Sequence, residues 1–69
     1  MDIVWVDGSV INVSIENDTA VISANREGMR SLAGQLTTLA ESAPGAHIHL
    51  DQYNSLEDGS VELVIERID

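Results

Sequence analysis

Two histidines and an aspartate occupy alternate positions in the segment His47-Ile-His49-Leu-Asp51. Side chains repeat every two residues along a strand, so an extended segment would point all three the same way. With Asp51 or Glu62, the two histidines could supply three nitrogen and oxygen ligands to zinc. The chain has no cysteine and only two histidines. We therefore favour a solvent-facing histidine pair beside carboxylates, with a metal site on His47, His49 and Asp51 as the alternative.

Other catalytic motifs are missing from the sequence. It contains no glycine-rich phosphate loop, no G-x-S-x-G elbow and no H-E-x-x-H helix. Asp51, Glu57 and Asp58 do not have the spacing of an EF-hand calcium loop. We therefore expect a protein that is not an enzyme and that holds no cofactor. A small metal-dependent or acid-base enzyme that uses His47, His49 and Asp51 is the alternative.

Acidic residues dominate the charge of the chain. Twelve aspartates and glutamates stand against three arginines and no lysine, for a formal net charge of −9. This negative charge repels the phosphate backbone of nucleic acids, so nucleic acid is not an expected partner. A basic protein surface would instead be attracted. An acidic composition that serves only solubility is the alternative.

The segment 52–60 is predicted to be a recognition loop. Its nine residues are long for a connection in a compact domain, and they include Tyr53, Glu57 and Asp58. Tyrosine is enriched at protein interfaces, so this loop is a candidate contact with a partner. A passive connection is the alternative.

The first 24 residues predict three strands joined by two-residue turns. Asp7-Gly8 and Asn17-Asp18 both suit type I′ turns, in which two residues have positive φ. With these turns, Val4 opposes Ile11, Val13 opposes Ile22 and Ile15 opposes Ala20. The residues predicted to share the core face are Val4, Val6, Ile11, Val13, Ile15, Ala20, Ile22 and Ala24.

A helix of about five turns is predicted after Asn25, which is a suitable N-cap. Pro44-Gly45 should end it, and Gly34 could allow close packing against the sheet. The apolar residues that recur at helical spacing are Met29, Leu32, Ala33, Leu36, Leu39, Ala40 and Ala43.

Two further strands follow the helix, at His47–Asp51 and within 61–68. Ile48 and Leu50 should join the core with Val61, Leu63 and Ile65. The predicted fold class is α+β: a single, mostly antiparallel sheet of about five strands with one helix on one face, in the order β-β-β-α-β-β.

The sheet face opposite the helix is the expected binding surface. Ile3, Trp5, Val10 and Val64 would form its apolar centre. The residues predicted to contact a partner, on this face or in the loop, are Trp5, Val10, His47, His49, Asp51, Tyr53, Glu57, Asp58, Glu62 and Glu66. A regulatory or structural homodimer built on the Trp5 patch is the alternative.

The length of 69 residues predicts one domain, residues 1–69. The acidic N-terminus, with an apolar run of only four residues, lacks the features of a signal peptide, and no run reaches the length of a membrane span. The expected location is the cytoplasm.

Three segments resemble a known family. They are Asn25-Arg-Glu-Gly28 at the start of the helix, His47-x-His-Leu-Asp51 after it, and Glu62-Leu-Val-Ile-Glu-Arg67 near the end. Together they resemble the bacterial polymorphic-toxin immunity proteins called immunity protein 32. The resemblance implies a small protein that neutralises a cognate toxin by direct binding.

Overall fold

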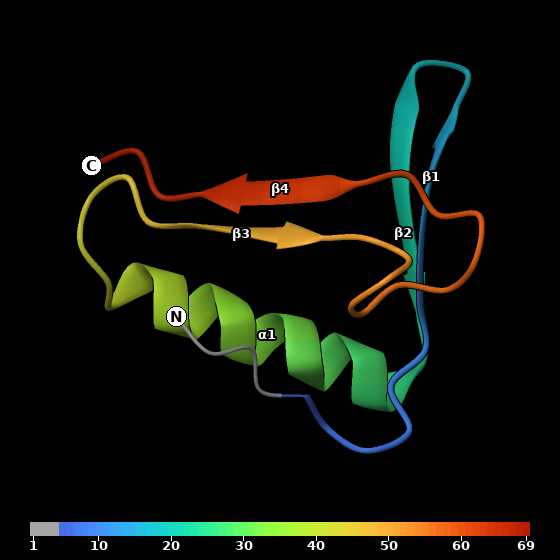
Figure 1. Ribbon diagram of the computed structural model, residues 1–69, viewed down its shortest axis with the longest axis horizontal. Coiled ribbons are helices and arrows are strands. Elements are labelled where there is room, and N and C mark those ends of the chain that lie inside the picture. Colours follow the sequence, from blue (N-terminus) through green and yellow to red (C-terminus); the bar gives the residue numbers. More distant parts are fainter. Residues whose placement is uncertain (1–4) are drawn as a thin grey trace.

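Residues 5–69, the part of the chain that the computed structural model describes, fold into one helix and two separate antiparallel sheets of two strands each. Figure 1 shows the elements, which in chain order are β1 (Ile11–Glu16), β2 (Thr19–Ala24), α1 (Arg26–Ala40), β3 (His47–Leu50) and β4 (Leu63–Glu66). The α+β class is confirmed. The predicted single sheet of about five strands is wrong.

The β1–β2 hairpin forms as the sequence predicts. Asn17 and Asp18 have φ values of 51° and 62°, so both turn residues lie in the left-handed region that a type I′ turn requires. Val13 pairs with Ile22, and Ile15 pairs with Ala20. The predicted turn and register are therefore confirmed.

The turn at Asp7-Gly8 does not begin a hairpin. The Ser9 N–H donates to the Val6 carbonyl at 3.2 Å, and Gly8 has a φ of 82° while Asp7 has no positive φ. Positive φ at the third position alone is the pattern of a type II turn, whose twist splays the flanking segments. No strand is present in residues 5–10, and the predicted pairing of Val4 lies outside the described residues.

Residues 57–61 occupy the edge of β1 where the first predicted strand would have paired. The Glu57 N–H donates to the Ile11 carbonyl at 2.8 Å, and the Val61 N–H donates to the Val13 carbonyl at 2.9 Å. The Ser60 hydroxyl accepts from the Val13 N–H at 3.1 Å. These bonds join the two sheets. In Figure 1 the strands of the hairpin run at a steep angle to β3 and β4.

Side chains from outside α1 bind both of its ends. Asn25 is the N-cap, as predicted: its side-chain Oδ1 accepts from the Gly28 N–H at 2.8 Å and from the Val10 N–H at 3.0 Å. The helix ends at Ala40, about a turn earlier than predicted. Beyond that point, the Arg67 guanidinium donates to the carbonyl oxygens of Ala40 and Ser42, which places a positive charge at the negative end of the helix.

The buried face of α1 is rotated from the predicted stripe. Leu32 and Leu39 are buried as expected, but Met29 and Leu36 are 50% and 51% exposed. The residues that face inward are Gly28, Ser31, Leu32, Gln35 and Leu39. Burial of the Ser31 hydroxyl is compensated by hydrogen bonds, because it accepts from the Val6 N–H at 2.8 Å and lies 2.7 Å from the Ser9 hydroxyl.

Gly28, and not Gly34, makes the close contact between α1 and the hairpin. A Cβ added at Gly28 would lie 2.7 Å from the Val10 carbonyl oxygen, whereas nothing lies within 4 Å of one added at Gly34. The absence of a side chain at Gly28 thus sets how closely the helix approaches β1.

The core lies between α1, the base of the hairpin and one face of β3–β4. Its members are Ile11, Val13, Leu32, Leu39, Ile48, Leu50 and Leu56, with Leu63 and Ile65 packed against them. The predicted inward positions in β3 and β4 are therefore confirmed. Val61 is 40% exposed, so its predicted place in the core is wrong. Leu56 lies in the loop between β3 and β4 and was not predicted.

Candidate functional site

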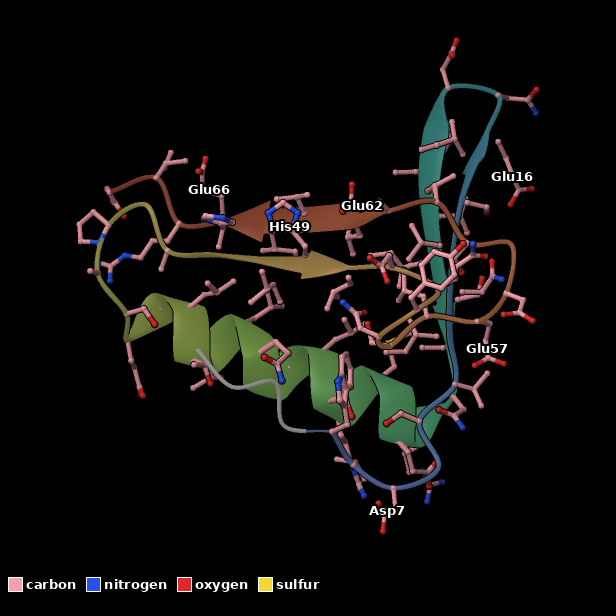
Figure 2. All side chains as sticks on the ribbon, viewed as in Figure 1. Asp7, Glu16, His49, Glu57, Glu62 and Glu66 are labelled. Carbon is pink, nitrogen blue, oxygen red and sulfur yellow. The ribbon has the colours of Figure 1, made fainter. Side chains whose placement is uncertain are left out.

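The face of β3–β4 that points away from the core carries His47, His49, Glu62, Val64 and Glu66, here called the outer face. His47 is paired with Glu66, and His49 with Val64. All five residues are exposed, and Figure 2 shows His49, Glu62 and Glu66 along this pair of strands. The predicted outward orientation of both histidines is confirmed.

The two histidines contact each other and a carboxylate at the surface. Their ring centroids are 5.1 Å apart with an interplanar angle of 74°, an edge-to-face contact. His49 Nδ1 lies 3.4 Å from Glu62 Oε2, and both side chains are more than half exposed. His47 Nδ1 lies 3.1 Å from the Gly45 carbonyl oxygen. These contacts hold the rings close to the strands while leaving them accessible.

Asp51 does not join the histidines. Its Oδ1 accepts from the backbone N–H groups of Tyr53 and Asn54, at 2.8 and 3.1 Å, so the carboxylate organises the following turn. Within residues 5–69, no three His, Asp or Glu side chains are grouped to hold a metal ion. Asp51 thus has a local structural role that the spacing alone did not indicate.

The loop 51–62 is held by side-chain to backbone hydrogen bonds. Asn54 accepts from the Asp51 N–H at 3.0 Å and donates to the His49 carbonyl at 2.9 Å. Gln52 accepts from the Gly59 N–H at 3.0 Å across the loop. Leu56 is 5% exposed and anchors the loop in the core. The loop is therefore an ordered part of the fold.

This ordered loop displays an aromatic side chain and two acids. Tyr53 is 88% exposed, and Glu57 and Asp58 are also exposed. Figure 2 shows Glu57 on the loop beside the base of the hairpin. A large side chain left in water on an anchored backbone is suited to contact another protein.

Trp5 and Val10 do not join the outer face. Trp5 is partly buried and packs against the core, so its predicted position at the centre of the face opposite the helix is wrong. Val10 is 45% exposed, and its N–H binds the Asn25 cap. The expected apolar centre keeps only Val64 among the described residues, because residues 5–10 form no strand that would carry Trp5 and Val10 onto this face.

Ile15 and Ile22 are exposed apolar residues that the sequence pattern placed in the core. They are 58% and 42% exposed. Both strands of the hairpin have six residues, whereas β3 and β4 have four. The polar turn at Asn17-Asp18, next to these residues, is the sequence signal that could have indicated exposure.

Cations are scarce on the described surface. Eleven of the twelve acidic residues lie within residues 5–69, against Arg26, Arg30 and Arg67. Arg67 binds the end of α1 and lies 3.7 Å from the Asp69 carboxylate. Among residues 5–69, no arginine forms an ion pair with the acids of the outer face or the loop. No helix in the described chain is long and apolar enough to cross a membrane.

Comparison with known proteins identifies a family. A family model described as Immunity protein 32 matches residues 19–68, which include β2, α1, β3, β4 and the loop 51–62. No curated protein and no solved structure matches the chain.

Proposed function

We propose that this chain, which belongs to the immunity protein 32 family, binds a cognate bacterial toxin and neutralises it stoichiometrically, without turnover. The family match is the observation that carries the proposal. The matched residues include the outer face and the loop 51–62, so the family pattern covers the surface to which we assign toxin binding.

We assign the centre of this contact to Tyr53. Its side chain is almost fully exposed, while the backbone around it is fixed by Asp51, Asn54 and the buried Leu56. A preorganised loop loses little conformational entropy when it binds, and exposed aromatic side chains are frequent hot spots. Tyr53→Ala should therefore weaken toxin binding by about 2 kcal/mol or more.

The partner surface is expected to be basic. Glu57 and Asp58 extend from the loop, and Glu62 and Glu66 from the outer face. Such an arrangement attracts a basic surface during encounter and is screened over about 8 to 10 Å at physiological salt. Association should slow as salt rises, and Glu57→Lys with Asp58→Lys should mainly lower the association rate. An association rate that is independent of salt would argue against this role for the acids.

Co-expression with the product of the neighbouring reading frame tests the function. Relief of growth arrest and co-purification of the two proteins are the expected results. The Tyr53→Ala variant should lose co-purification, whereas Leu36→Ala, which truncates an exposed apolar residue on α1, serves as the matched control. A neighbouring product that arrests growth equally in the presence and absence of this protein would contradict the proposal.

A further inference from the structure

One face of the β1–β2 hairpin passes from the core into solvent. Strand alternation and the observed register put Ile11, Val13 and Ile15 of β1 on the same face as Ala20, Ile22 and Ala24 of β2. Along β1 the exposure of these side chains rises from 0% at Ile11 and 2% at Val13 to 58% at Ile15. The face is therefore part of the core at its base and open at its far end.

The hairpin overhangs the rest of the protein because it is longer than the layer that covers it. Residues 57–61 bond to β1 only as far as Val13, and Figure 1 shows the turn of the hairpin standing beyond β4. Ile15, Ala20 and Ile22 are exposed there, and we call these three residues the hairpin patch. Within the described chain, nothing buries this patch.

The charges around the patch indicate what would cover it. The segment 11–24 carries Glu16 next to the turn and Asp18 within it, and contains no arginine. Glu62 lies at the end of β4 nearest the hairpin (Figure 2). A second copy would bring its own net charge of −9 to the same place, which opposes self-association. An apolar centre with an acidic surround is complementary to an apolar surface with a basic surround.

We propose that the hairpin patch is a second docking surface for the basic toxin, separate from Tyr53 and in contact with an apolar part of the toxin. This inference rests on the proposed function. Isoleucine side chains lose apolar surface to the partner on binding, so they contribute affinity, whereas the acids chiefly accelerate encounter. Contacts at Tyr53 and at the hairpin would place the toxin across both sheets.

The test compares matched substitutions on the two faces of the same hairpin. Ile15→Thr with Ile22→Thr removes apolar surface and keeps β-branched side chains. Val21→Thr makes the same kind of change on the opposite face, because Val21 pairs with Ser14. The probe is the purified product of the neighbouring reading frame that co-purifies with the wild-type protein, and binding is measured by calorimetry. Circular dichroism checks that each variant is folded.

We expect the double variant to bind about tenfold or more weakly, with Val21→Thr close to wild type. Binding of the double variant within twofold of wild type would overturn the inference and leave the proposed function standing. A wild-type protein that binds no neighbouring product would refute the proposed function itself. If the double variant does not fold, the toxin binding of the single variant Ile15→Thr is the test, since that side chain is the more exposed of the two. The proposal would also be overturned if the wild-type protein is a dimer while the double variant is a monomer that binds the toxin as tightly as wild type. The patch would then bind a second copy of the chain.

Discussion

The two glycines of α1 should respond in opposite directions to substitution by alanine. At Gly34, a new Cβ meets nothing within 4 Å, so Gly34→Ala gains only helix propensity, about 1 kcal/mol. At Gly28 the same gain is opposed by contacts at 2.7 Å with the Val10 carbonyl oxygen, 2.9 Å with Ile11 Cγ1 and 3.0 Å with Ala24 Cβ. Overpacking costs about 1–3 kcal/mol. One of these neighbours is backbone, so we place the cost near the upper value and expect Gly28→Ala to lose about 2 kcal/mol net.

The measurement is urea unfolding followed by the fluorescence of Trp5, the only tryptophan of the chain. The two variants should differ in free energy of unfolding by about 3 kcal/mol, which for a domain of this size is a difference of about 12 °C or more in Tm. The pair controls for helix propensity, since both substitutions are Gly→Ala in one helix. A Gly28→Ala variant at least as stable as Gly34→Ala would refute the close packing of α1 on the hairpin.

Further stability predictions follow from single contacts, each measured by chemical denaturation followed by circular dichroism. Asn25→Ala should lower the free energy of unfolding by about 1–2 kcal/mol, because the Asn25 side chain accepts hydrogen bonds from the N–H groups of both Gly28 and Val10. An unchanged denaturation midpoint would contradict this. Leu56→Ala should cost about 2–4 kcal/mol as a core truncation, and a loss below about 0.5 kcal/mol would show that the loop is not anchored there. Arg67→Ala should cost about 1–2 kcal/mol through the end of α1, with Arg67→Lys losing less. Trp5→Ala should destabilise the fold by about 1–3 kcal/mol because Trp5 packs against the core. An unchanged free energy of unfolding would support the prediction from sequence that Trp5 lies on the sheet face opposite the helix.

The sequence correctly predicted those features of the fold that depend on interactions between residues close in sequence. The turn at Asn17-Asp18, the register of β1 with β2 and the Asn25 cap all depend on residues close in sequence. Alternation also predicted the orientation of His47 and His49 correctly, because one face of β3–β4 is buried and fixes the other.

Long-range contacts determined what the sequence pattern missed. The edge of β1 is taken by residues 57–61, which lie more than 40 positions away, and hydrophobic periodicity does not indicate such a pairing. With that edge occupied, residues 5–10 form no strand, and Trp5 packs against the core and not on the outer face. The buried face of α1 was misjudged because periodicity counts apolar residues, whereas Gly28 and the hydrogen-bonded Ser31 are what the packing brings inward.

Titrating a fixed amount of active cognate toxin with this protein tests the claim that it neutralises the toxin by stoichiometric binding. We predict that toxin activity falls linearly and reaches zero at an equivalence point, with a complex of the same composition recovered by size-exclusion chromatography. Incubation time should not move the equivalence point once binding is complete. Inactivation of many toxin molecules by each molecule of this protein, increasing with time, would contradict the claim.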